Sequence, residues 1–139
     1  MDLKAELDAA KAKYPSVDLS AQEAVFNNEN STIEEIKAAT GNVQFTIRTA
    51  IGAGATWDSP VDFTEFIVDP SFETGDFGKW VAPISNDTGI KPNSNGTYHV
   101  DNCDGEYLFN TWGGNAALKI EQDLGKVPNG VYSLTALYA

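Results

Sequence analysis

Apolar residues in the first 56 positions recur at helical spacing, whereas later ones alternate or form short runs between turns. Leu3, Leu7 and Ala10 lie four and three positions apart, which predicts a helix over about residues 2–13. Tyr14-Pro15 should end this helix, because a residue before proline avoids helical backbone angles. The first 56 residues are therefore predicted to be a helical segment of two or three helices.

Two capping-box patterns predict the remaining helices. Ser20 with Glu23 should open a short second helix, and Ser31 with Glu34 a third and longest one. Arg48 is expected on the exposed face of the third helix, and Gly41 should weaken it by about 1 kcal/mol relative to alanine. Five apolar positions form a seam of the seven-residue type, Ile33, Ile36, Val43, Ile47 and Ala50. A bundle of so few residues has a small hydrophobic core, and we therefore expect it to require packing against another part of the protein for stability.

The remaining sequence is typical of strands separated by glycine-rich turns, with no helical pattern between them. The expected strands cover residues 63–68, 80–84, 97–100, 106–112, 118–124 and a final run that includes Tyr132 and Leu134. This pattern favours an antiparallel β-sandwich or jelly roll over residues 57–139, so the whole chain is expected to be α+β. The final strand lacks a following turn or partner, so we expect the sandwich to be incomplete.

Composition and charge exclude several classes of function. The 139 residues include nine basic and twenty acidic side chains, a formal charge of −11 that repels nucleic-acid phosphates and anionic lipid. No apolar run approaches the ~20 residues that a membrane-spanning helix needs, so we expect no membrane insertion, and the residues after Met1 lack the basic-then-apolar pattern of a secretion signal. Cys103 is the only cysteine, which excludes a disulfide framework. His99 is the only histidine, so catalytic triads and histidine metal sites lack parts, and we expect no enzyme activity.

Five segments, in order, carry a family resemblance. Residues 66–75 (FIVDPSFETG) precede Gly78-Lys79-Trp80, and residues 105–109, 120–124 and 127–134 follow. They resemble the galactose-binding-like β-sandwich of carbohydrate-binding module families four, nine and twenty-two, although Asp69 replaces the usual asparagine. The resemblance implies a glycan or polysaccharide partner and a secreted parent protein with other domains, located outside the cell, at its surface or in the periplasm. It also implies helical spacers, and further strands beyond those seen here.

Sugar recognition needs flat apolar rings beside planar polar groups, and the segment over residues 98–112 contains both. Trp112 is the first candidate platform, and Asn110 shares its strand face. Tyr98 and Tyr107 flank the loop over residues 101–104 and complete the predicted ligand site. The alternative for each aromatic residue is a place in the core of the sandwich.

The resemblance also implies a structural calcium ion, with Glu73 as one ligand. Calcium prefers several oxygen ligands around a turn, and Asp101 and Asp104 could add to the set, with Glu106 close by. The alternative is an acidic turn that is simply solvated. We expect a non-catalytic carbohydrate-binding accessory module; the alternative is a structural spacer or adhesion module without a small-molecule ligand.

Overall fold

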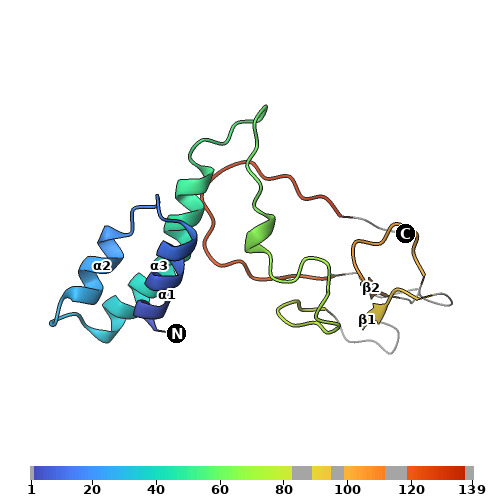
Figure 1. The fold of residues 1–139 in the computed structure, drawn as a ribbon, viewed down its shortest axis with the longest axis horizontal. Helices are drawn as coiled ribbons and strands as arrows, with labels where there is room; N and C mark the ends of the chain where they lie inside the picture. The colour runs from blue at the N-terminus through green and yellow to red at the C-terminus, as the bar shows by residue number, and fades with distance from the viewer. Residues whose placement is uncertain (1, 83–88, 95–98, 112–118, 137–139) are drawn as a thin grey trace. The chain divides into compact units, whose positions relative to one another are not determined.

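The computed structural model describes residues 2–82, 89–94, 99–111 and 119–136. These residues form three α-helices, one 3-10 turn and a two-stranded antiparallel sheet, which confirms a mixed α and β fold (Figure 1). The helices are α1 (Leu3–Lys13), α2 (Ser20–Asn27) and α3 (Ile33–Gly52), followed by η1 (Thr64–Phe66), β1 (Gly89–Pro92) and β2 (Tyr107–Asn110).

The chain divides into two compact units. The first, here called the helical unit, comprises Met1–Val61 together with Gly125–Val131. The second, here called the strand unit, comprises Asp62–Leu124 and Tyr132–Ala139. Within the described ranges, no helix is both long and apolar enough to cross a membrane.

The first helix matches its prediction. Leu3, Leu7 and Ala10 are all buried, and α1 ends at Lys13, immediately before Tyr14-Pro15. Asp2 caps the helix, because its carboxylate accepts a hydrogen bond of 3.0 Å from the backbone N–H of Lys4.

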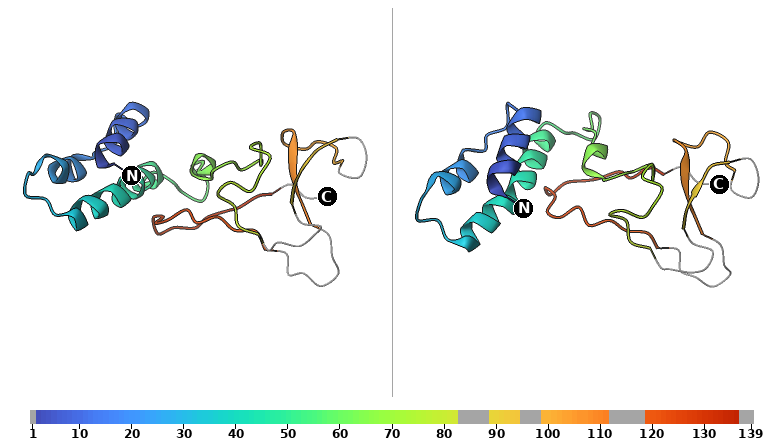
Figure 2. Two further views of the ribbon diagram at one scale, coloured as in Figure 1. Left: turned by 90° about the horizontal axis from the view of Figure 1, so that it is seen from below. Right: turned by 60° about the horizontal axis from the view of Figure 1, so that its bottom comes forward.

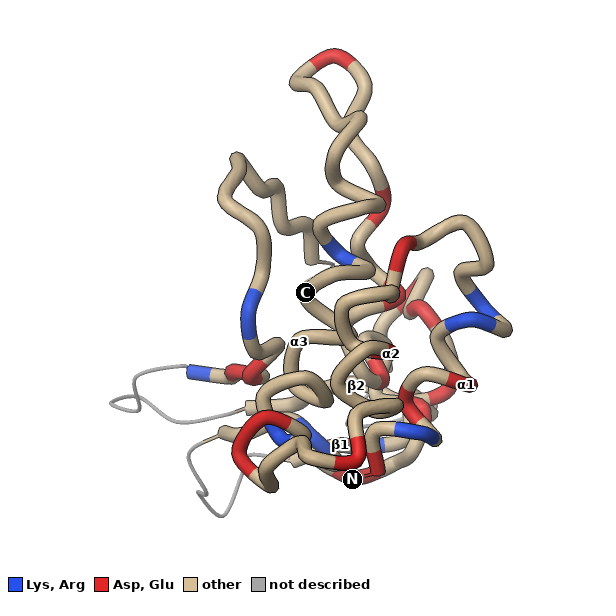
Figure 3. The backbone as a smooth tube through the Cα atoms, turned by 90° about the vertical axis from the view of Figure 1, so that its left-hand side faces the viewer, with Lys and Arg blue, Asp and Glu red and all other residues tan. Residues whose placement is uncertain are grey.

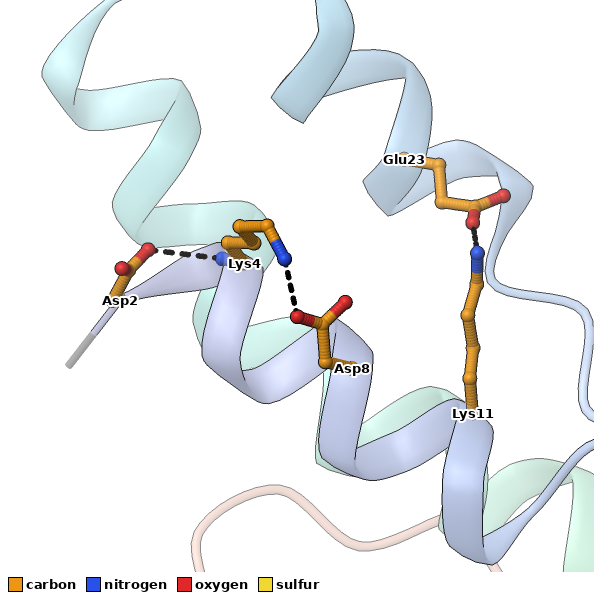
Figure 4. A network of polar contacts seen from close by, with 5 residues as sticks. All are labelled: Asp2, Lys4, Asp8, Lys11 and Glu23. Atoms are coloured by element: carbon orange, nitrogen blue, oxygen red, sulfur yellow. Dashed lines mark hydrogen bonds and ion pairs between the residues drawn. The ribbon is translucent and has the colours of Figure 1, made fainter.

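Charged side chains line the exposed side of α1 (Figure 4). Lys4 pairs with Asp8 one turn later, and this ion pair raises the pKa of the lysine, chiefly through its hydrogen bond to the carboxylate. Lys11 reaches across to Glu23 and so links α1 to α2. All these side chains are at least partly exposed, so each pair adds little to stability.

Both predicted capping boxes need correction. Ser20 is the first residue of α2, and its N-cap, Leu19, makes no side-chain cap bond; instead the Asp18 carboxylate accepts from the backbone N–H of Ser20 at 2.9 Å. In α3 the cap is Thr32, one residue later than predicted, and its hydroxyl accepts from the backbone N–H of Glu35 at 3.2 Å. The Glu35 carboxylate accepts in return from the Thr32 N–H at 2.8 Å, which completes a capping box and lowers the glutamate pKa.

The core of the helical unit lies where α1 and α2 pack on α3 (Figure 2). Val43 and Ile47 are fully buried, as predicted, but Ile33 is 66% and Ile36 38% exposed, and Ala50 is exposed. At about 1.5 Å per residue, α3 is nearly twice as long as α1, so its neighbours cover only part of the seam.

Arg48 is buried, so its predicted place on an exposed face is wrong. Its guanidinium Nη1 donates a hydrogen bond of 2.9 Å to the backbone carbonyl of Lys126. The Lys126 ammonium in turn lies 3.5 Å from the side-chain oxygen of Asn42. These contacts attach Gly125–Val131 to α3, although this segment lies far along the sequence.

The strand unit contains less regular structure than predicted. β1 pairs with β2 from Gly89 opposite Asn110 to Pro92 opposite Tyr107, which confirms the core of the strand predicted over 106–112. Beyond this sheet, the described residues show one isolated antiparallel bridge, between Val81 and Glu121. No sandwich or jelly roll is shown by these residues, so that architecture stays a prediction.

The strand predicted over residues 63–68 is wrong. Asp62 accepts a hydrogen bond of 2.7 Å from the backbone N–H of Thr64, which starts η1 in its place and buries Phe66. β1 (Gly89–Pro92) lies in none of the predicted strands. Residues 99–100 and 131–136 lie outside any strand, and residues 119–124 contribute only the bridge at Glu121.

Candidate functional site

The loop over residues 69–80, which carries the most distinctive part of the family resemblance, is organised around Asp69. The Asp69 carboxylate accepts hydrogen bonds from the Thr74 hydroxyl at 2.6 Å and from the backbone N–H of Glu73 at 2.7 Å. The bond from the Thr74 hydroxyl is the main reason why the Asp69 pKa is lowered. Asp69 itself has a φ of +50°, and its carbonyl accepts from the indole N–H of Trp80 at 2.9 Å.

Aromatic rings join this loop to β2. The ring centroid of Phe72 lies 5.5 Å from that of Trp80 and 6.1 Å from that of Phe109. Phe77 contacts Phe109 edge-on from the same loop, at 6.3 Å. These distances are typical of favourable aromatic pairs, so the four rings form a small apolar cluster.

Glu73 connects the loop to the start of β2 through backbone groups. Its carboxylate oxygens accept from the backbone N–H of Glu106 at 3.1 and 3.0 Å and from that of Tyr107 at 3.3 Å. Gly105, just before, has a φ of +99°, and a Cβ atom there would lie 2.1 Å from a Glu73 oxygen. The positive φ favours glycine at this position, and any other residue would displace the Glu73 carboxylate.

A second connection runs to the segment near residue 122. The Gln122 side-chain amide accepts from the backbone N–H of Val68 at 2.7 Å and donates to the carbonyl of the same residue at 2.8 Å. The amide thus satisfies both backbone groups of Val68, as a neighbouring strand would. The bridge between Val81 and Glu121 holds the same segment.

The predicted sugar-binding residues are only partly described. Asn110 and Tyr107 both lie on β2 and both are half-buried, whereas Trp112 and Tyr98 lie outside the described residues. Asn110 and Tyr107 are three positions apart on a strand, so their side chains belong to opposite faces. The Tyr107 side chain packs against Gly75 of the 69–80 loop. A Cβ atom on Gly75 would lie 3.0 to 3.3 Å from the end of the Tyr107 ring and its hydroxyl.

The predicted calcium ligands each have a different partner. Glu73 binds backbone N–H groups, the Asp104 carboxylate accepts from the Ser71 hydroxyl at 3.2 Å, and Asp101 lies 3.1 Å from the His99 Nε2. The part of the chain that the structure describes holds no group of three histidine, cysteine or acidic side chains arranged for a metal ion. The calcium site stays a prediction.

Charged groups are distributed over both units, with acidic side chains the more numerous (Figure 3). Trp57 is 83% exposed and belongs to the helical unit.

Comparison with protein-family models, curated proteins and solved structures finds no match to this chain.

Sequence reasoning missed two residues that organise this region. Asp69 accepts the hydrogen bonds that shape the 69–80 loop, and the Gln122 side chain bonds the backbone of Val68. Asp69 had a detectable signal, because an Asp-Pro pair such as Asp69-Pro70 favours the start of a turn. Gln122 had none, because its partner Val68 lies 54 residues away.

Proposed function

We propose that the chain is a non-catalytic carbohydrate-binding module with a helical N-terminal part, in which the strand unit recognises the glycan. One observation carries this proposal. Segments on which the family resemblance rests, far apart in the sequence, contact one another through the residues of the motifs themselves. Glu73 binds the backbone at residues 106–107, the Phe72 ring packs on Phe109, and Gln122 pairs with Val68.

This network supports a fold of the galactose-binding-like type, because in a chance resemblance the motif residues would have no reason to meet. The finer architecture, a two-sheet sandwich, is part of the proposal. The motif residues that we find engaged are scaffold residues, so they position the site and do not themselves contact sugar.

The proposed glycan site lies on the face of β2 that carries Asn110. Residues at even spacing share a strand face, so Leu108 belongs with Asn110, and opposite them Tyr107 and Phe109 face the 69–80 loop; Trp112, the predicted platform, follows Asn110 two positions later in the sequence. A side-chain amide next to an aromatic ring provides both groups that sugar recognition requires, a planar polar group for the hydroxyls and an apolar plane for the ring carbons.

A structural spacer or adhesion module is the second candidate. It is favoured by the number of motif residues already bound to protein groups, such as Glu73 and Tyr107, which leaves few side chains on the loop side for a ligand. The two proposals differ in one measurable property, which is affinity for soluble glycan.

The test is binding of the full chain to a glycan array, followed by titration calorimetry with soluble oligosaccharides chosen from the array. We expect Trp112→Ala and Asn110→Ala to abolish binding to whichever oligosaccharide binds. Trp57→Ala is the matched control, because it removes an indole ring that is 83% exposed in the helical unit, and it should leave binding unchanged.

Two results would overturn the proposal. If a chain that is folded by circular dichroism binds no glycan on the array, the spacer alternative takes its place. If Trp57→Ala abolishes binding while Trp112→Ala does not, the site is not on β2.

A further inference from the structure

The segment Gly125–Val131 contains an asparagine-glycine pair with an unusual local structure. Asn129 and Gly130 are both exposed and form a bend, yet neither has a positive φ. An Asn-Gly pair in a tight hairpin turn of type I′ has positive φ at both residues and a hydrogen bond across the turn. Neither residue takes part in a hydrogen bond with any other described residue.

This geometry leaves the reacting groups of a known peptide rearrangement unprotected. The backbone nitrogen of Gly130, after losing its proton to hydroxide, can attack the side-chain amide carbon of Asn129. A five-membered succinimide forms and ammonia leaves, and water then opens the ring to aspartate or isoaspartate. Glycine favours the attack because it has no side chain to hinder the approach and allows the backbone to rotate. We propose that Asn129 is a site of spontaneous deamidation.

Asn93, Asn42 and Asn30, all within the described residues, lack this combination, and none of them precedes a glycine. Both polar atoms of the Asn93 side chain are hydrogen-bonded to Val100. The amide oxygen accepts from the Val100 backbone N–H at 2.9 Å, and the amide nitrogen donates to the Val100 carbonyl at 3.1 Å. Asn42 lies within α3, before the buried Val43. The Ser31 N–H, the attacking group for Asn30, is bonded to the Asn28 carbonyl at 3.0 Å.

The product changes the chain at a defined place. Each event adds one negative charge to a chain that already carries −11, and the isoaspartate form also inserts a carbon into the backbone. The insertion falls three residues after Lys126, whose carbonyl accepts from the buried Arg48. The modified segment is thus the one that is attached to α3.

The test is incubation of the full chain in mildly alkaline buffer, followed by trypsin digestion and mass spectrometry over time. Cleavage after Lys126 releases residues 127–139, in which Asn129 is the only asparagine, and cleavage after Lys37 and Arg48 releases residues 38–48, in which Asn42 is the only one. We expect the first peptide to gain the mass of deamidation, at a rate that rises with pH, and to react with isoaspartyl methyltransferase. The second peptide should stay unchanged and serves as the internal control.

Gly130→Val is the matched variant, because it keeps the asparagine and hinders the attacking nitrogen. It should slow the reaction at Asn129 by more than tenfold. Equal rates in the variant and the parent chain, or a rate at Asn129 no faster than at Asn42, would overturn the proposal. The result does not depend on glycan binding.

Discussion

Replacing Gly105 by alanine tests the contact between Glu73 and β2. The new Cβ would lie 2.1 Å from a Glu73 oxygen, so the carboxylate must leave its position. It would lose its hydrogen bonds to the backbone N–H groups of Glu106 and Tyr107, at a cost of about 1 kcal/mol for exposed bonds to a charged group. The φ of +99° adds a further ~1–2 kcal/mol for any residue with a Cβ atom.

A double-mutant cycle separates these two costs. In a Glu73→Ala background the carboxylate is already gone, so Gly105→Ala should cost only the backbone part, about 1 kcal/mol less than in the parent chain. Gly78→Ala is the matched control. Its φ is +49° and the nearest atom to its Cβ position is 3.5 Å away, so its cost should be the same in both backgrounds.

The assay is urea unfolding followed residue by residue in two-dimensional NMR spectra. Amide signals of Tyr107 and Phe109 report on the strand unit, and those of Val43 and Ile47 on the helical unit. If Gly105→Ala costs the same with and without Glu73, the carboxylate does not occupy the place described, and the reasoning is wrong.

Three further predictions concern a glycine within α3, the N-cap of α3 and the titration of Asp69. Gly41→Ala should raise the free energy of unfolding of the helical unit by about 1 kcal/mol, because Gly41 is exposed in mid-helix with no atom within 4 Å of its Cβ position; no gain in urea unfolding would contradict this. Thr32→Ala should lower it by ~1 kcal/mol, whereas Ser20→Ala, which keeps the bond from the backbone N–H of residue 20 to Asp18, should lower it by less. Because the folded pKa of Asp69 lies below the ordinary 3.8, the stability from its hydrogen bonds is present above that pH and lost as the pH falls through the folded pKa. The Trp80 indole N–H signal should therefore shift in this acid range in the parent chain but not in Asp69→Asn, and equal shifts in both would refute the link.

The helical part was largely predictable because its signals are local. The stripe of Leu3, Leu7 and Ala10 determines the buried face of α1, and the structure confirms it. The start of α3 was missed by one residue because two overlapping boxes, from Ser31 and from Thr32, both satisfy the pattern. The Ser31 hydroxyl instead donates to the carbonyl of Val25, which the pattern could not reveal.

The strand unit was less predictable because distant contacts decide its structure. The burial of Arg48 in the helical unit shows the same effect, since its acceptor on Lys126 lies 78 residues away. The resemblance selected Glu73 as a functional residue, but its partners are backbone N–H groups, which no side-chain pattern identifies. Apolar runs such as the one after Asp62 do not by themselves distinguish a strand from a short turn.

The central claim is that the strand unit recognises a glycan on the β2 face that carries Asn110. The most direct measurement is the two-dimensional amide NMR spectrum of the full chain, recorded while an oligosaccharide selected on the array is added. We predict saturable shifts at Leu108 and Asn110, with Val43 and Ile47 unmoved. No shift with any oligosaccharide tested, or shifts confined to the helical unit, would contradict the claim.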